Sequence, residues 1–161
     1  MIESIEDVPL LIRREIEARI IAPFVDGLSR RFPREQVVEI LGETVVGIAR
    51  EQAAALPARL GGNDLKSFEQ VTQKWTAHGA LELDVLVHDA HRYDFNVTCC
   101  RYAEMYRRLG IPELGAILSC GRDFAAGEGF NPALTLTRTQ TLLNGADHCD
   151  FRYRLEGGKN K

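Results

Sequence analysis

Residues 81–100 read LELDVLVHDAHRYDFNVTCC, and this stretch decides the fold class. Apolar side chains occupy every second position from 81 to 87 and again from 93 to 97. Such alternation is typical of a strand with one buried face, because successive side chains of a strand point to opposite faces. The polar triplet Asp89-Ala90-His91 separates the two runs. The stretch therefore predicts two antiparallel strands joined by a tight turn.

The chain upstream of this hairpin has the apolar spacing of helices. Between residues 5 and 32 apolar positions recur every three to five residues, and they include Leu11, Ile12, Ile16, Ile20, Phe24 and Leu28. Similar spacing predicts helices over residues 34–55 and 64–78. Pro23 removes a backbone donor from the first helix, so we expect a kink or a break near Ala22. The apolar stripes of these helices are expected either to cover the sheet or to form a homo-oligomer interface.

Downstream of the hairpin the sequence predicts short helices followed by two more strands. Residues 101–120 favour two short helices, and Gly127-Glu128-Gly129 is expected to form a loop. Alternating apolar and β-branched residues then predict a strand over residues 134–142, and a second strand follows over 148–155.

Helices that precede an antiparallel sheet indicate an α+β fold. We expect N-terminal helices packed with a four-stranded antiparallel sheet of two hairpins, with short helices between the hairpins. The helical segment 1–79 and the α+β region 80–161 are predicted to form one integrated domain, because 161 residues suit a single core.

Composition excludes several classes of partner. Lys and Arg total 20 against 23 Asp and Glu, without a basic block, so nucleic acid is not expected to bind. No stretch approaches the roughly 18 to 20 apolar residues that span a bilayer, and the N-terminus is acidic where an export signal would be basic. The chain has four cysteines, which the cytoplasm would keep reduced. We therefore expect a cytoplasmic protein that does not associate with membranes.

Cys100 is the candidate nucleophile. It ends the second predicted strand and opens the next helix, where backbone amides and the helix dipole favour a thiolate and lower the pKa of a thiol. The alternative is a small buried hydrophobic residue, which is the commonest fate of a free cysteine.

Three further residues join this hypothesis. Cys149 falls on the inward face of the last strand, and Asp123 follows Cys120 by three residues, so Asp123 can share a helical face with Cys120 and act as a base. His148 points away from Cys149, because neighbours on a strand face opposite sides. The three cysteines with His148 or Asp123 would supply enough ligands for zinc, but their spacing lacks a zinc signature. We predict no metal and no other cofactor.

Arg138 is also turned inward by its strand pattern. A buried guanidinium cannot lose its charge, so it needs an anion beside it. That anion is either an Asp or Glu of the protein or the carboxylate of a substrate, which a guanidinium can grip with two parallel bonds. In the second case the three thiols and Arg138 gather around one pocket.

From Asn96 to Arg154 the chain carries a series of linked blocks. They are NVTCCRYAEMY (96–106), LGIPELG (109–115), ILSC (117–120) with RD (122–123), GFNP (129–132), LTRTQT (136–141) and GADHCDFRY (145–153). Through these blocks the chain resembles the L-2-amino-thiazoline-4-carboxylic acid hydrolase family over more than a third of its length. Cys99 stands where that family usually has a basic residue, so Cys99 is the cysteine least expected to act.

The resemblance implies a hydrolase that opens a C–N bond in a cyclic amidine or amide. The substrate would be a 2-amino-thiazoline ring bearing a carboxylate, and the product a carbamoyl derivative of cysteine. Cys100, or water activated beside it, would attack the ring carbon while Asp123 handles protons and Arg138 holds the carboxylate. Cys120 and Cys149 complete the catalytic set. Candidates for further substrate contacts are Tyr102, Asn131, Thr139, Thr141 and His148.

Two other functions fit the same residues. A pocket with a well-placed arginine can bind a small molecule without transforming it, as a sensor domain does. An enzyme that opens or isomerises a different heterocycle would also present these side chains.

Overall fold

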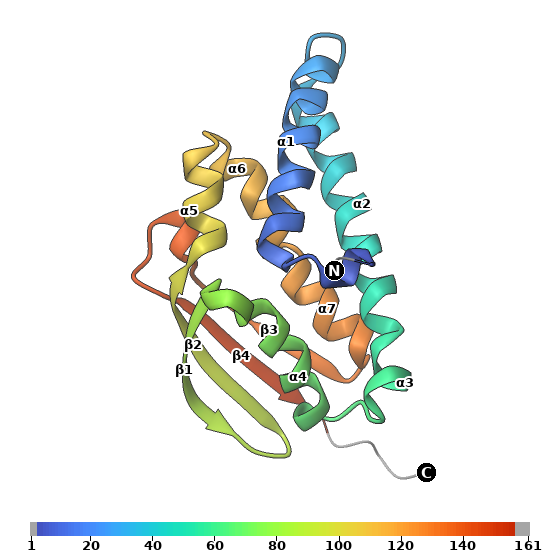
Figure 1. The fold of residues 1–161 in the computed structure, drawn as a ribbon, viewed down its shortest axis with the longest axis vertical. Coiled ribbons are helices and arrows are strands. Elements are labelled where there is room, and N and C mark those ends of the chain that lie inside the picture. The colour runs from blue at the N-terminus through green and yellow to red at the C-terminus, as the bar shows by residue number, and fades with distance from the viewer. Residues whose placement is uncertain (1–2, 157–161) are drawn as a thin grey trace.

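The computed structural model describes residues 3–156, and long helices precede the sheet (Figure 1). The first helices are α1 (Leu10–Ser29), α2 (Arg34–Ala54), α3 (Leu56–Leu60) and α4 (Leu65–Thr76). The hairpin β1 (Leu81–His88) and β2 (Arg92–Cys100) follows, as predicted. The remaining elements are α5 (Arg101–Arg108), α6 (Pro112–Gly115), the π-helical segment η3 (Ala116–Cys120), α7 (Arg122–Phe130), β3 (Leu134–Thr137) and β4 (Cys149–Leu155), with short 3-10 turns at Ile5–Asp7, Ala77–Gly79 and Leu142–Asn144. The predicted α+β class is confirmed.

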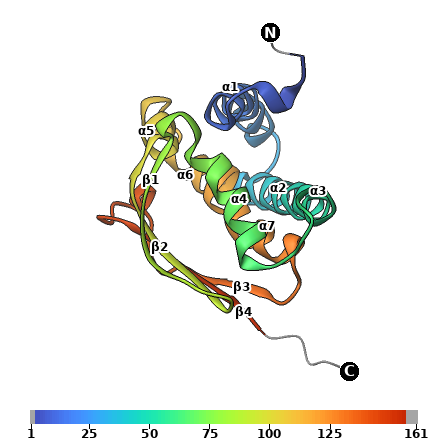
Figure 2. The same ribbon diagram turned by 60° about the horizontal axis from the view of Figure 1, so that its bottom comes forward.

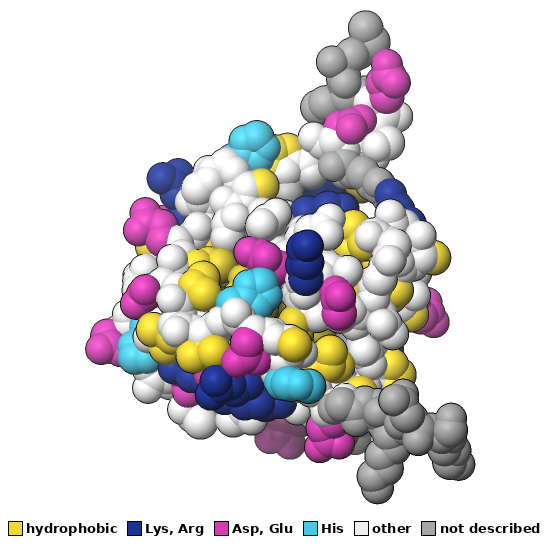
Figure 3. All heavy atoms as spheres, turned by 90° about the horizontal axis from the view of Figure 1, so that it is seen from below, with side chains coloured by type: hydrophobic (Ala, Val, Ile, Leu, Met, Phe, Trp, Pro, Cys, Tyr) yellow, Lys and Arg dark blue, Asp and Glu magenta, His cyan; other side chains and the backbone are white. Residues whose placement is uncertain are grey.

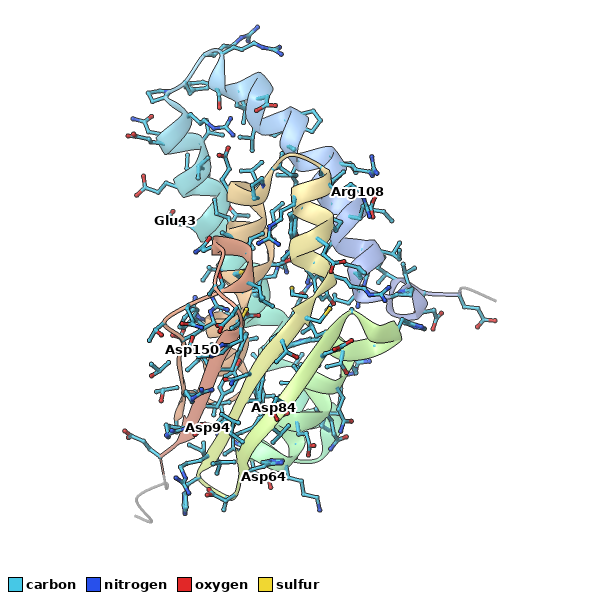
Figure 4. All side chains as sticks on the ribbon, turned by 90° about the vertical axis from the view of Figure 1, so that its left-hand side faces the viewer. Glu43, Asp64, Asp84, Asp94, Arg108 and Asp150 are labelled. Atoms are coloured by element: carbon cyan, nitrogen blue, oxygen red, sulfur yellow. The ribbon has the colours of Figure 1, made fainter. Side chains whose placement is uncertain are left out.

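The four strands form one curved antiparallel sheet in the order β1-β2-β4-β3, and the helices lie on its concave side (Figure 2). Phe95 on β2 faces Phe151 on β4 in the register, and their stacked rings are 4.8 Å apart between centroids. The other face of the sheet carries Asp84, Asp94 and Asp150, which project from β1, β2 and β4 (Figure 4). The alternation read from the sequence therefore separates an aromatic inner face from a charged outer face in β2 and β4. In β1 an irregularity between Val85 and Val87 places His88 rather than Val87 opposite Tyr93.

Two apolar clusters form the core. One joins α1 and α2 to α5, α6 and η3, and the other joins α2 and α4 to α7 and the inner face of the sheet. Cys100 packs against both clusters. Each cluster draws residues from both sides of the boundary predicted near residue 80, and the division itself stays a prediction.

The apolar stripe predicted on α1 is divided, because Leu11 and Leu28 pack against the core while Ile12, Ile16, Ile20 and Phe24 are exposed. Ile16 and Ile20 are 51% and 68% exposed, whereas Ala18 and Val25 on the opposite side are buried. Of the two alternatives expected for the N-terminal helices, α4 covers the sheet through Phe68 and Val71, whereas these exposed residues of α1 do not. Pro23 does not end α1, which continues to Ser29, because Pro23 lies on the exposed side, where water can bind a carbonyl that has lost its partner.

Two predicted boundaries in the second half are also wrong. β3 ends at Thr137 rather than at residue 142, because the amides of Thr139 and Gln140 donate to the carboxylate of Asp150 at 2.9 Å instead of to a strand. The glycines at 127 and 129 do not form a loop but lie within α7. Their missing side chains let α7 approach the Tyr153 ring and the backbone of α2 closely.

Candidate active site

Cys100 occupies the junction between β2 and α5, as the sequence predicted. It is the N-cap of α5, and its Sγ accepts a hydrogen bond from the Ala103 amide at 3.4 Å. Burial nevertheless raises the pKa of the Cys100 thiol to about 11, because the loss of water outweighs the hydrogen bond from the amide. The expected lowering of the Cys100 pKa is therefore wrong, and the thiol is neutral at rest.

Cys120 and Cys149 lie within electrostatic reach of Cys100. Cys120 ends η3, and burial raises its pKa to about 12, with Cys100 and Cys149 adding to the rise. Cys149 begins β4, where burial also raises the pKa of its thiol, and its Sγ accepts a hydrogen bond from the Leu142 amide at 3.2 Å. The fold thus brings three thiols from separate parts of the chain together in their neutral form.

Asp123 and Arg138 form an ion pair beside these thiols. The side chains are 20% and 8% exposed, and Arg138 also donates to the Cys120 carbonyl at 3.1 Å. The Arg138 guanidinium lies 5.0 Å from the ring centroid of Phe124 and 5.2 Å from that of Phe151. Of the two anions considered from the sequence, a carboxylate of the protein occupies Arg138 in this structure.

Asp123 has an unusual protonation equilibrium for an aspartate. Burial raises its pKa from 3.8 to about 6, although the charge of Arg138 and its hydrogen bond act in the opposite direction, as do the charges of Arg14 and Arg122. A carboxyl group with a pKa near neutrality can both take and return a proton under physiological conditions. Such a shift in a cluster of polar side chains marks a candidate catalytic group.

Tyr102, another predicted substrate-binding residue, interacts electrostatically with Cys100 and Asp123. It is buried on α5, and its hydroxyl donates to the Trp75 carbonyl at 3.2 Å. Burial raises the pKa of Tyr102, and the charges of Cys100 and Asp123 raise it further. The phenol therefore stays protonated, and because its O–H donates to Trp75, only its oxygen lone pairs can take a further hydrogen bond.

The other predicted polar residues organise nearby loops. The Thr139 hydroxyl donates to Asp150 at 2.7 Å, and the Thr141 hydroxyl accepts from the Asn144 amide at 3.2 Å. These bonds hold the segment between β3 and β4, which connects Arg138 to Cys149. Their substrate contacts stay predictions.

Asn131 and His148 lie at the edges of this region. Asn131 donates to the Asn63 carbonyl at 2.9 Å, which ties the end of α7 to the loop before α4. The His148 ring contacts the exposed side chain of Asp147 at 2.6 Å. Neither side chain makes its hydrogen bonds to the thiols or to Asp123.

Sequence reasoning missed a second charged group next to Asp123. Arg14 on α1 donates to both carboxylate oxygens of Glu17 at 2.7 Å, and Arg122 lies 3.5 Å from the same carboxylate. On α5 and η3, Tyr106 and Ser119 share a hydrogen bond of 2.8 Å. The available signal was that Arg14 lies on the buried side of α1, four residues before Ala18, which can be recognised only when that side is known.

Two surface hollows lie away from the thiols. One of about 460 Å³ is lined by Asp64, Leu65, Lys66, Glu69, His88, Asp89 and Ala90, at the end of the molecule shown in Figure 3, where acidic, basic and histidine side chains are mixed. The other, of about 220 Å³, lies between α1 and α2 and is lined by Leu28, Phe32, Gln36, Val37 and Ile40. Neither hollow is lined by Arg138, Asp123 or a cysteine, although a pocket was expected around those residues.

Metal-binding and membrane-spanning features are absent from the part of the chain that the structure describes. Among residues 3–156, no group of three or more His, Cys, Asp or Glu side chains is arranged to hold a metal ion. No described helix combines the length and the apolar character that crossing a bilayer requires.

Solved structures with the same fold include two ligand-bound proteins. The phenol-responsive sensory domain of the transcription activator PoxR, with phenol, has a TM-score of 0.55 and 10% identity over 84% of this chain and 73% of that one. A trafficking protein particle complex subunit 3 from Naegleria fowleri, covalently bound to palmitic acid, has a TM-score of 0.52 and 13% identity over 91% of this chain and 96% of that one. At these identities the likeness shows the fold alone.

A family model agrees with the resemblance seen in the C-terminal half and extends it. No curated protein matches the chain significantly. The model of the L-2-amino-thiazoline-4-carboxylic acid hydrolases matches residues 13–153, which is nearly the whole chain and includes α1 and α2. The chain therefore belongs to the L-2-amino-thiazoline-4-carboxylic acid hydrolase family.

Proposed function

We propose that this protein hydrolyses a C–N bond in a small cyclic amidine or amide that carries a carboxylate, with 2-amino-thiazoline-4-carboxylate as the first candidate. The observation that carries the proposal is Asp123, a buried carboxyl group with a pKa of about 6 beside three thiols and Arg138. The family name supplies the reaction class. The four free cysteines support a reducing compartment, so we assign the reaction to the cytoplasm.

The chemistry needs one acid–base group and one attacking group. The carbon between the ring nitrogen and the ring sulfur is electrophilic, and a nucleophile that adds to it must lose a proton. Asp123 takes this proton and returns it to the ring nitrogen as the C–N bond breaks. With water as the net reactant, the product is a carbamoyl derivative of cysteine. Arg138 holds Asp123 in place and limits the rise of its pKa.

Two attacking groups fit this arrangement. Cys100 can add to the ring carbon as its proton passes to Asp123, and water then releases the product. Alternatively, Asp123 activates water directly, and the neutral thiols of Cys100, Cys120 and Cys149 form the wall of the site. Replacing Cys100 by Ala separates the two routes: a loss of about a thousandfold or more in kcat indicates a thiol nucleophile, and retained turnover indicates water.

Tyr102 is assigned to substrate binding because it interacts electrostatically with both Cys100 and Asp123, and its hydroxyl oxygen can accept a hydrogen bond from the amino group of the substrate. Thr139 and Thr141, with Asn131 and His148, remain proposed substrate contacts.

The proposal is tested by incubating the protein with 2-amino-thiazoline-4-carboxylate. We expect a product that is heavier by one water, detected by liquid chromatography with mass spectrometry. The Asp123→Asn variant should lose at least a hundredfold in kcat. The matched control is Asp84→Asn, an exposed aspartate on the outer face of the sheet, which should keep full activity. Equal activity of the Asp123→Asn variant and the wild type would contradict the mechanism.

A sensor function is the second candidate, and the shared fold with a phenol-responsive sensory domain is the observation that favours it. A sensor would bind cyclic amidines, imides or ureides without changing them. Mass spectra that show every compound intact, together with a raised melting temperature in the presence of one of them, would support this alternative. A different heterocycle as substrate would appear in the same panel as hydrolysis of another member.

A further inference from the structure

Arg14 and Arg122 are two further cations whose charges act on Asp123, and the proposed reaction does not use them. Arg14 belongs to α1, and Arg122 is the first residue of α7, directly before Asp123. Their side chains are only 12% and 13% exposed. Both charges reach Asp123, since each lowers the pKa of its carboxyl group. The charge of Arg14 also lowers the pKa of Tyr102, which in turn interacts with Cys100. Arg14 thus acts on both Asp123 and Tyr102, whereas Arg122 acts on Asp123.

The charges of this region do not balance. Among the described side chains that interact with Asp123 and Arg122, three guanidiniums, those of Arg14, Arg122 and Arg138, face two carboxylates, those of Glu17 and Asp123. The nearby phenols of Tyr102 and Tyr106 have raised pKa values and add no negative charge. Burial and the charge of Arg14 together lower the pKa of Arg122. Because a buried cation is costly without an anion, this excess of positive charge favours the binding of one more carboxylate.

Of these three arginines, Arg122 makes the longest contact with a carboxylate of the protein. Its separation from the Glu17 carboxylate is 3.5 Å, whereas Arg14 reaches that carboxylate at 2.7 Å. The Nε atom of Arg122 donates to the Leu118 carbonyl at 2.8 Å, which fixes the direction of the guanidinium. Arg138, by contrast, is bonded to Asp123 and to the Cys120 carbonyl. A guanidinium has five donors in a rigid fork, so Arg122 can accept a second carboxylate more readily than Arg138 can.

We propose that Arg122, assisted by Arg14, binds the carboxylate of the substrate, while Arg138 remains on Asp123 as a positioning residue. This assignment rests on the proposed function and revises the role first expected of Arg138. Arg122 and Asp123 lie in the first turn of α7 with their side chains on different sides of the helix, and the charge of Arg122 reaches Asp123 and lowers its pKa. A small ring held by its carboxylate at Arg122 would extend from there toward Asp123. Glu17 competes with the substrate for the same two guanidiniums.

The assignment is tested by comparing two ligands that differ in the carboxylate. 2-Amino-thiazoline-4-carboxylate carries it, and 2-amino-2-thiazoline does not. Binding is measured by calorimetry and, where turnover occurs, through KM. We expect Arg122→Gln and Arg14→Gln to weaken binding of the carboxylate by about 10- to 100-fold and not to weaken binding of the ring that lacks the carboxylate. Arg122→Lys should recover part of the loss, because it restores the charge without the fork.

A matched control is Arg19→Gln on the same helix, since Arg19 is 60% exposed and pairs with Glu15 on the outer side. It should bind both ligands as the wild type does. Glu17→Gln provides a test that does not depend on a loss of binding, because it removes the anion that competes with the substrate. A gain in binding cannot result from a misfolded variant. We expect Glu17→Gln to tighten binding of the carboxylate about three- to tenfold without tightening binding of the ring that lacks the carboxylate. Unchanged or weaker carboxylate binding in Glu17→Gln would overturn the assignment.

The outcomes separate this assignment from the hydrolase proposal. If the wild type binds the carboxylate through Arg122 but releases no product, the hydrolase proposal fails and the assignment stands. If hydrolysis occurs and Arg138→Gln, rather than Arg122→Gln, removes the preference for the carboxylate, the assignment fails and the hydrolase proposal stands. If the wild type neither binds nor converts either ring, both are wrong.

Discussion

The pKa of Asp123 results from opposing influences on a carboxyl group that is largely buried. Its pKa rises to about 6 because burial penalises the charged form more than Arg138 and its neighbours favour it. The same burial raises the pKa values of the three thiols around it. At neutral pH the cluster therefore contains an ionised carboxylate beside neutral thiols, so the carboxylate is the group ready to accept a proton.

The pH dependence of hydrolysis should follow Asp123. Below about pH 6 the carboxyl group is protonated and cannot accept a proton, so kcat/KM should rise about tenfold per pH unit and become level above that value. Arg138→Gln removes a charge that lowers the Asp123 pKa, so the rising limb should move to higher pH. Arg138→Lys keeps the charge and should leave the limb nearly in place. Profiles of kcat/KM between about pH 5 and 8 measure these shifts, and a limb that does not move in Arg138→Gln would contradict the role of Asp123.

The three clustered thiols should resist alkylation in the folded protein. With a pKa of about 11, only about one Cys100 side chain in ten thousand is a thiolate at pH 7, and burial further limits access. Iodoacetamide labelling followed by peptide mass spectrometry should show Cys100 and Cys120 reacting far more slowly than in urea-denatured chain. Labelling of Cys100 at the denatured rate would show that its thiol is activated after all.

At the scale of elements, the contact between α2 and α7 depends on a glycine. A side chain at Gly129 would place its Cβ 2.3 Å from the Arg50 carbonyl oxygen, so the two helix backbones meet there without a side chain between them. Gly47, also on α2, has open space around its Cα. The two positions therefore predict opposite effects of the same substitution.

Gly129→Ala should destabilise the protein by about 1–3 kcal/mol, because the backbones of α2 and α7 must move apart. Gly47→Ala should stabilise it by roughly 0.5–1 kcal/mol, because alanine has the higher helix propensity and meets no neighbour. Urea denaturation followed by circular dichroism gives both free energies of unfolding. Equal effects of the two substitutions would mean that the close approach of the helices does not limit stability.

At the scale of the whole molecule, α1 presents an apolar stripe to solvent. The stripe consists of Ile12, Ile16, Ile20 and Phe24, which recur every four residues, and all four are exposed. On a helix this spacing forms a continuous ridge, about 18 Å long from the first residue to the last. An antiparallel copy matches the ridge with itself, since Ile12 then faces Phe24 and Ile16 faces Ile20. We therefore expect a homodimer through α1.

Light scattering after size-exclusion chromatography should give twice the mass of one chain. Ile16→Glu should give a monomer, because a carboxylate in the centre of the apolar contact is costly. The control is Val85→Glu on β1, since Val85 is as exposed as Ile16, at 51%, but lies outside the stripe. A wild-type monomer would show that the stripe does not serve self-association.

Local pattern was sufficient for several features of this fold. Alternation predicted the hairpin of β1 and β2, and it placed Cys149 and Arg138 on the inner side. The position of Cys100 at the junction of a strand and a helix also followed from spacing. These features depend on the two- and 3.6-residue periods of a single element, which neighbouring residues reveal.

Packing between distant elements decided the rest. Which side of α1 faces the core, and hence the burial of Arg14, depends on α5 and η3, more than 80 residues away. The same packing gave Arg138 its partner in Asp123 and raised the pKa of Cys100, which helix position alone predicted to fall. Periodicity shows where a side chain points relative to its own helix or strand. Desolvation and charge pairing depend on what stands opposite, and only the tertiary structure brings those groups together.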